Sequence, residues 1–161
     1  MKVHHGSLEC VETPEIREPN RTLDYGSGFY TTTSYEQAEE WVRRKMKGNR
    51  AAKGFVNEYE LDIDQLQSVK CLLFESPTDE WIDFVMNNRL NKDFVHDYDI
   101  VYGPVANDRV YTCFALYEGG LMSKQNLLAE LKTYELVDQY LFHTEQALQL
   151  LTFTKAHEIL L

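Results

Sequence analysis

The spacing of hydrophobic residues along the chain changes from helical to alternating, and each spacing predicts a different element. Ser34 and Gln37 form a capping box, and apolar residues then recur at intervals of three and four up to Gly48. Residues 54–62 alternate between apolar and polar instead, which is typical of a half-buried strand. The pattern therefore predicts a helix from residue 34 to residue 48, followed by a strand.

The remaining elements are shorter and are predicted from apolar runs, turns and caps. Further strands are expected at 69–74, in the interior of a sheet, at 99–102, closed by Gly103-Pro104, and at 136–143 and 152–160. Further helices are expected to begin at Ser76-Pro77, with the proline in the first turn, and to cover 123–131 and 144–151. Residues 108–118 fit a helix or a strand, and the Gly119-Gly120 stop favours the helix. Because strands and helices mix without a regular βαβ order, the sequence predicts an α+β fold in a single domain, 1–161.

The charge of the chain bears on the kind of partner it can have. The formal net charge is −10, from 26 acidic and 16 basic residues, so broad electrostatic binding of nucleic acid is disfavoured. The basic cluster from Arg43 to Lys53 has two interpretations. It could guide a polyphosphate or an acidic partner locally, or it could be the solvated face of a helix.

The distribution of apolar residues and cysteines predicts a cytoplasmic protein with no membrane contact. Apolar runs stay well below the roughly 18–20 residues of a membrane span, and the first residues lack the apolar core of a signal peptide. Cys10, Cys71 and Cys113 form neither a disulfide framework nor a zinc pattern, which fits a reducing compartment, and all three are expected to be buried. The spacing of the histidines suggests no metal site either.

Three strand-like segments carry the residues that suggest chemistry. The first ends in His5-Gly6-Ser7, where a flat carboxamide could approach a backbone without a Cβ and the imidazole could donate to a sugar hydroxyl. The second begins with Gly28-Phe29-Tyr30 and offers a phenol ring for stacking. The third contains Gln139, a polar residue between apolar neighbours. Each residue alone has an ordinary structural explanation, and only their combination indicates a dinucleotide site.

In this order the motifs resemble the ADP-ribosyltransferases, in particular the branch of diphtheria toxin and the poly(ADP-ribose) polymerases, whose signature is His, Tyr and Glu. More narrowly, residues 24–32, with the sequence DYGSGFYTT, and residues 103–109, with the sequence GPVANDR, resemble a bacterial family of unknown function that is grouped with these enzymes. The resemblance extends from Met1 to about Phe153.

The resemblance implies a split β-sheet core with flanking helices and NAD as co-substrate. His5 would bind the nicotinamide-side ribose, Gly6 would hold the carboxamide, Tyr30 would stack on nicotinamide, and Gln139 would stand where the catalytic Glu is expected. Tyr35 or Trp41 would complete the nicotinamide pocket, and the sequence does not choose between them. The other expected NAD-binding residues are Ser7, Asp24, Gly28, Phe29 and Asn107.

The implied activity is mono-ADP-ribosylation of a macromolecule with release of nicotinamide. The acidic surface favours a protein acceptor over a nucleic acid. Relatives of this kind suggest a bacterial toxin with a neutralising antitoxin protein. Gln139 departs from the pattern, because an amide brings no negative charge and cannot act as a base, and losing such a charge costs on the order of 10²–10³ in rate. The alternatives are a catalytically weak module that binds NAD, ADP-ribose or a protein partner, and an interaction scaffold.

Overall fold

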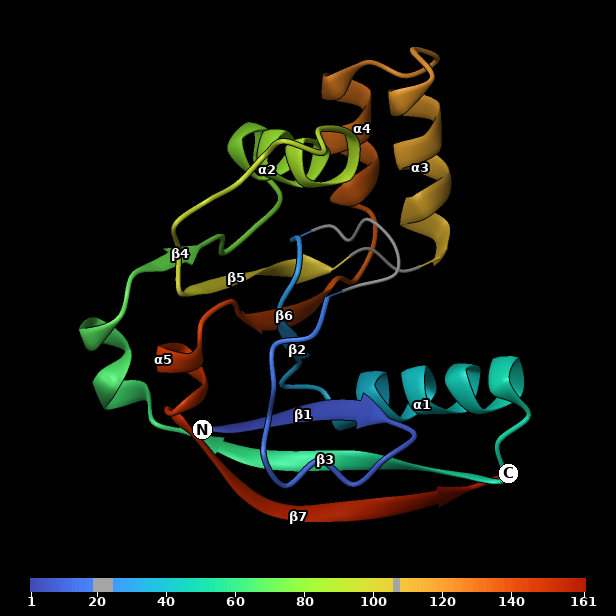
Figure 1. Ribbon diagram of the computed structural model, residues 1–161. Helices are drawn as coiled ribbons and strands as arrows, with labels where there is room; N and C mark the ends of the chain where they lie inside the picture. Colours follow the sequence, from blue (N-terminus) through green and yellow to red (C-terminus); the bar gives the residue numbers. More distant parts are fainter. Residues whose placement is uncertain (19–24, 106–107) are drawn as a thin grey trace.

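Two β-sheets and several helices build the chain, in the mixed α+β class predicted from the sequence. The computed structural model describes residues 1–18, 25–105 and 108–161. The first sheet has the order β1-β3-β7 and the second the order β2-β6-β5-β4 (Figure 1). The strands are β1 Lys2–Ser7, β2 Phe29–Thr31, β3 Lys53–Leu61, β4 Cys71–Leu73, β5 Ile100–Val105, β6 Val137–Phe142 and β7 Leu151–Leu160. The helices are α1 Tyr35–Asn49, α2 Asp79–Leu90, α3 Asp108–Glu118, α4 Lys124–Leu131 and α5 Glu145–Leu148, with a 3-10 helix at Ile63–Ser68.

Within the described ranges, one isolated backbone bridge connects the two sheets. The amide of His4 donates to the carbonyl of Thr32 at 2.7 Å, and the amide of Thr32 donates to the carbonyl of His4 at 3.0 Å. This antiparallel pair sets β1 beside the end of β2. The free edge of the three-stranded sheet therefore adjoins the free edge of the four-stranded sheet, and the site described below lies along this seam.

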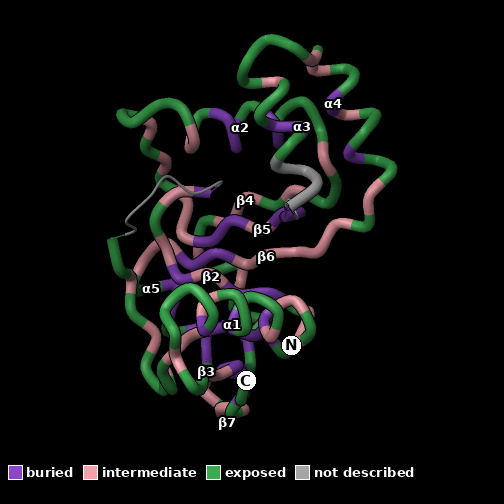
Figure 2. The backbone as a smooth tube through the Cα atoms, turned by 90° about the vertical axis from the view of Figure 1, so that its right-hand side faces the viewer, coloured by how far each residue is buried: buried purple, intermediate pink, exposed green. Residues whose placement is uncertain are grey.

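Each sheet has its own helical cover, and the two sheets share a core between them. The buried side of α1 packs on β3 and β7 of the three-stranded sheet. Residues of α2, α3 and α4 pack on one face of the four-stranded sheet, around the buried Trp81 and Phe114. On their other faces the two sheets contribute to a common apolar cluster, with Val3 and Tyr59 from one and Phe29 and Phe142 from the other. Figures 1 and 2 show α1 beside the three-stranded sheet and the other three helices beyond the four-stranded one.

The helix and strand predictions that rest on local signals are confirmed. Ser34 caps α1 by accepting a hydrogen bond from the amide of Gln37 at 3.2 Å, and Ser123 caps α4. The helix at 108–118 also has the expected bounds. One strand and two proline positions differ from the prediction. The strand predicted in a sheet interior, β4, lies at the edge of its sheet and is partly exposed.

Two proline positions also differ from the prediction. Thr78 caps α2, so Pro77 precedes the helix instead of standing in its first turn. Gly103-Pro104 does not close β5, which continues to Val105. Pro104 is tolerated there because β4 ends opposite Tyr102, leaving one side of β5 without a strand partner that needs an amide.

Two expectations about the surface can be compared with the structure. Among the described residues, no helix is both long enough and apolar enough to span a membrane. Cys113 is buried as expected, but Cys71 is only half-buried and Cys10 is exposed. Cys10 lies in the segment after β1, where no helix or strand covers it.

Candidate functional site

The seam between β1 and β2 opens directly after the bridge at His4. In an antiparallel sheet, successive residues direct their amide and carbonyl groups to alternate sides. Because His4 bonds to Thr32 of the neighbouring strand, the backbone groups of Gly6 also point toward β2 and away from β3. Within the described part of the chain, no backbone hydrogen bond joins Gly6 to β2. One amide donor and one carbonyl acceptor are therefore presented side by side along the edge of β1.

The imidazole of His5, and not the backbone of Gly6, makes the hydrogen bond to β2. Its Nδ1 lies 2.7 Å from the carbonyl oxygen of Tyr30. Since a carbonyl only accepts, Nδ1 carries the proton and donates. The ring also stacks on Phe29, with centroids 4.3 Å apart and an interplanar angle of 28°. Phe29 thus supports His5, whereas the sequence had suggested that Phe29 would contact NAD.

The protonation state of His5 determines what it can offer to a ligand. Burial lowers the pKa of His5 to about 4, and the charges of Lys45 and Arg17 lower it further, against the raising effect of the bond to the Tyr30 carbonyl. The ring is therefore neutral at pH 7, with Nδ1 protonated and Nε2 carrying a lone pair. Nε2 can accept a hydrogen bond from a hydroxyl but cannot donate one, in contrast to the donor expected from the sequence.

Gly6 lacks a side chain because α1 approaches it closely. A Cβ at this position would lie 2.7 Å from the carbonyl oxygen of Ala38, 3.0 Å from Cγ2 of Val42 and 3.2 Å from Cδ1 of Trp41. The packing of α1 therefore requires a glycine here, and the predicted close approach of a ligand to its backbone stays a prediction. The backbone amide and carbonyl of Gly6 are a separate feature from its missing side chain, and they point toward β2.

The two aromatic candidates on α1 lie on different sides of the helix. Tyr35 makes edge-to-face contacts with His4, at 5.6 Å between ring centroids, and with His157 of β7, at 5.2 Å. Trp41 is 36% exposed and lies beside Gly6. Of the two candidates, the geometry therefore places Trp41, and not Tyr35, next to the open backbone edge.

Tyr30 and Gln139 share a face of the joined sheets with Gly6. Paired residues in neighbouring strands point to the same face, and the face alternates along each strand. Thr32 pairs with His4, so Tyr30 lies on the face of His4 and Gly6. Tyr30 in turn pairs with Leu141 of β6, and Gln139 is two residues from Leu141. Both Tyr30 and Gln139 are half-buried.

The phenol of Tyr30 is fixed in place, because its hydroxyl donates to the carbonyl of Gly26 at 2.6 Å. Gly26 adopts a φ of +82°, a left-handed conformation that favours glycine. The three signature positions are therefore only partly brought together. Tyr30 and Gln139 share one face, whereas the ring of His5 stacks on Phe29 of the opposite face and reaches the other two only through the Tyr30 carbonyl.

The carboxylate next to Gln139 is already engaged. Asp138 accepts hydrogen bonds from the amide of Thr33 at 2.9 Å, the hydroxyl of Thr33 at 2.6 Å and the hydroxyl of Thr32 at 3.3 Å. These contacts attach the end of β2 to β6. Asp138 is therefore a structural carboxylate and does not replace the charge that Gln139 lacks.

The other predicted contact residues have structural partners or lie outside the described residues. The Ser7 hydroxyl accepts from the amide of Glu9 at 3.2 Å. A Cβ on Gly28 would lie 2.8 Å from the carbonyl of Phe142 and 3.0 Å from Nδ1 of His143. Asp24 and Asn107 belong to segments that the structure does not describe.

Two residues of the basic cluster noted in the sequence, Arg44 and Lys45, lie near Trp41. Cζ of Arg44 and Nζ of Lys45 each lie 5.7 Å from the centre of the Trp41 ring, within the range of a cation–π contact. The helical spacing of positions 41, 44 and 45 was visible in the sequence, but only the structure shows that this side of the helix adjoins Gly6. The remaining charges from Arg43 to Lys53 cannot all be assigned to this side, since Arg43 bonds to Glu39 and to the carbonyl of Leu160.

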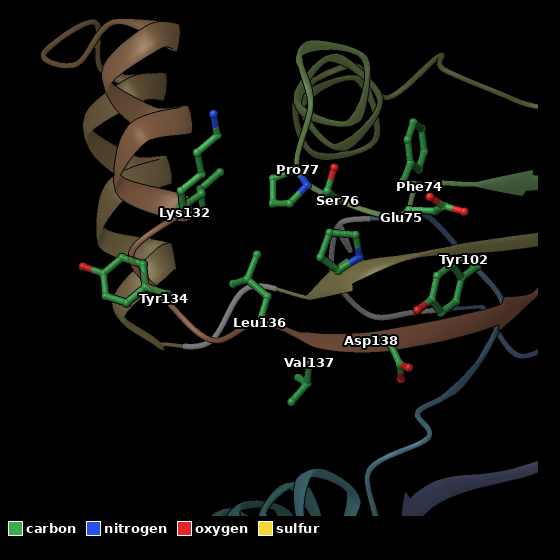
Figure 3. Close-up of a pocket in the computed structure, with 12 residues that line it drawn as sticks. Phe74, Glu75, Ser76, Pro77, Tyr102, Lys132, Tyr134, Leu136, Val137 and Asp138 are labelled. Atoms are coloured by element: carbon green, nitrogen blue, oxygen red, sulfur yellow. The ribbon is translucent and has the colours of Figure 1, made fainter.

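A pocket of about 230 Å³ lies elsewhere, at the ends of β5 and β6 near the start of α2 and the end of α4. Figure 3 shows Tyr102 directing its hydroxyl inward, whereas Lys132 and Tyr134 direct their polar ends outward. Asp138 lines this pocket, but His5, Tyr30 and Gln139 do not. This cavity is therefore not the site predicted from the sequence. Among the described residues, no group of three His, Cys, Asp or Glu side chains is arranged to hold a metal ion.

Comparison with known families gave one match, over nearly the whole chain. Residues 1–153 match a family described as "Protein of unknown function (DUF3990)", and the chain belongs to this family. The same comparison with curated proteins and with solved structures gave no match.

Proposed function

We propose that this member of the DUF3990 family is an NAD-dependent mono-ADP-ribosyltransferase, which transfers ADP-ribose to a macromolecule and releases nicotinamide. One observation carries the proposal. In the part of the chain that the structure describes, the amide and carbonyl of the buried Gly6 point toward β2 without a backbone hydrogen bond to it, Tyr30 and Gln139 lie on the same face as Gly6, and the exposed Trp41 lies beside it.

These groups suit a nicotinamide ring. A primary carboxamide has one acceptor oxygen and one donor NH₂ group, which complement the amide and the carbonyl of Gly6. The ring attached to it would lie near the faces of Trp41 and Tyr30, and stacked aromatic pairs contribute about 0.5–1.5 kcal/mol beyond the burial of their area. The hydrogen bond from Tyr30 to Gly26 means that little side-chain freedom is lost when a ligand stacks there.

The reaction would break the bond between the nicotinamide nitrogen and the anomeric carbon of ribose. The electron pair of that bond leaves with nicotinamide, the nucleophile of the acceptor forms a bond to the same carbon, and the proton of the nucleophile passes to solvent. The Gln139 amide would contact a ribose hydroxyl near this carbon. His5 would hold the strand of Tyr30 and offer Nε2 as an acceptor for a second hydroxyl.

The kind of acceptor is inferred from the charge of the chain, and the biological role from the resemblance to ADP-ribosyltransferases. The net charge of −10 favours a protein acceptor over a nucleic acid. The resemblance suggests a toxin that acts in the bacterial cytoplasm and is neutralised by an antitoxin protein. Neither feature is needed for the chemistry proposed at the seam.

A second candidate function is a module that binds NAD or ADP-ribose with little turnover. The observation that favours it is that, among the described residues, the carboxylate next to Gln139 in β6, Asp138, is already held by Thr32 and Thr33. A neutral amide cannot stabilise a developing positive charge on ribose as a carboxylate does.

The substitution Gln139→Glu separates the two functions. If the site is built for transfer, a carboxylate at this position raises nicotinamide release from NAD, by as much as 10²–10³-fold. Nicotinamide is measured by chromatography, and NAD binding by titration calorimetry in parallel. Gln149→Glu, at an exposed position after α5, is the matched control for the added charge. Tight NAD binding with no gain in release would favour the binding module.

A further inference from the structure

The side of α1 next to Gly6 carries a concentration of positive charge in an acidic protein. Trp41 touches the position where a Gly6 side chain would lie, and Arg44 and Lys45 each approach the same indole ring to 5.7 Å. Arg43, in contrast, lies on the other side of the helix, where it reaches the carbonyl of Leu160 at the end of β7. Two cations therefore lie near the indole beside Gly6, although the chain as a whole is acidic.

The charges nearest to Gly6 determine whether an anion can bind beside it. Charges more than about 8–10 Å apart in water are largely screened at physiological salt, so a bound anion responds mainly to its nearest neighbours. The Lys45 ammonium is close enough to His5 to contribute to lowering its pKa, which supports its place near the seam. The electron-rich Trp41 ring attracts both cations and so helps to hold them near Gly6.

The order of Trp41 and the two cations along α1 matches the order of nicotinamide and diphosphate in a dinucleotide. In NAD, one ribose separates the nicotinamide ring from the diphosphate. Lys45 follows Trp41 by four residues, which is about one helical turn, or roughly 5–6 Å along the axis. If the nicotinamide lies at Gly6 and Trp41, the next anionic group of the ligand lies within reach of the cations one turn further on.

We propose that Arg44 and Lys45, which flank the Trp41 indole beside Gly6, bind the diphosphate of the dinucleotide. This inference rests on the proposed function, because the position of the diphosphate is counted from a nicotinamide at Gly6. Arg44 supplies a planar guanidinium that can bond two phosphate oxygens at once, and Lys45 supplies a compact charge. The pair would make the site selective for phosphate-bearing ligands over nicotinamide alone.

The test is calorimetric titration of the full chain with four probes. NAD and ADP-ribose carry the diphosphate, inorganic pyrophosphate is the diphosphate alone, and nicotinamide lacks it. The double variant Arg44→Gln, Lys45→Gln removes both charges and keeps side chains that suit a helix. Lys47→Gln is the matched control, because Lys47 is exposed on the same helix and outside the Trp41 cluster.

We expect the double variant to weaken NAD and ADP-ribose binding by about tenfold or more, since a hydrogen bond to a charged group contributes about 1.5–3 kcal/mol. Nicotinamide binding should stay within twofold, and added salt should weaken NAD binding less in the variant than in the wild type. Lys47→Gln should bind all probes like the wild type.

The outcomes separate this inference from the proposed function. If the wild type binds NAD and the double variant binds it within twofold of the wild type, the diphosphate assignment is wrong and the proposed function stands. If pyrophosphate and ADP-ribose bind through Arg44 and Lys45 but nicotinamide does not bind, the assignment holds and the proposed function fails. If the wild type binds none of the probes, both are overturned.

Discussion

Replacing Gly6 by alanine tests the packing of α1 against β1 in a quantitative way. The new Cβ would lie 2.7 Å from the carbonyl oxygen of Ala38, a backbone atom of a capped helix that cannot move alone. Overpacking of this kind costs about 1–3 kcal/mol. Alanine recovers about 0.5–1 kcal/mol, because glycine loses more conformational freedom when it is fixed in a strand. We therefore expect Gly6→Ala to lower the free energy of unfolding, by up to about 2.5 kcal/mol.

Gly48→Ala is the matched control, because nothing lies within 4 Å of a Cβ at that position in α1. The same substitution there should raise the free energy of unfolding by up to about 1 kcal/mol. Both values come from urea unfolding followed by circular dichroism, with the denaturant slope unchanged from the wild type. Equal stability of the two variants would refute the argument that α1 requires a glycine at position 6.

Two further predictions concern buried polar groups. Tyr25→Phe removes a hydroxyl that donates to the carbonyl of Pro104 and accepts from Nε1 of Trp81 at 2.6 Å. The free energy of unfolding, measured by thermal and urea unfolding, should therefore fall by about 1–3 kcal/mol. An unchanged free energy of unfolding would mean that these bonds do not form. Burial raises the pKa of Glu58, but hydrogen bonds from Lys2 and Thr154 outweigh it and lower the pKa from 4.5 to about 2. The ionised Glu58 therefore stabilises the fold above pH 4.5, and this stability is lost as the pH falls toward 2. Glu58→Gln should be less stable at pH 7 and should lose less stability on acidification, whereas parallel acid profiles would contradict the assignment.

The sequence predicts those parts of the fold that neighbouring residues determine. The cap of α1 depends on a hydroxyl and an amide three residues apart, and it forms as expected. The edge position of β4 depends on which strands lie beside it, and its apolar run does not contain this information. Pro104 is tolerated inside β5 for the same kind of reason, because β4 ends before reaching it.

In the candidate site too, some features follow from neighbouring residues in the sequence, and others depend on contacts between distant segments. The strands that carry His5, Tyr30 and Gln139 were predicted, and alternation correctly separates Asp138 from Gln139. The faces of the joined sheets depend on the His4–Thr32 pair, which no local pattern reveals. That pair places the ring of His5 opposite Tyr30 and leaves the Gly6 backbone edge open. The choice of Trp41 over Tyr35 also depends on how α1 packs against the sheet.

The most direct test of the central claim follows the two halves of NAD separately. The protein is incubated with NAD labelled in the ADP-ribose part and a bacterial lysate, and both nicotinamide release and label on macromolecules are measured. The wild type should release nicotinamide and label protein, Tyr30→Ala should do neither, and Tyr35→Ala, which changes an aromatic residue on the other side of α1, should retain both activities. Circular dichroism checks that both variants fold. NAD that stays intact with the folded wild type, or equal transfer by Tyr30→Ala, would contradict the assignment of the seam as a transferase site.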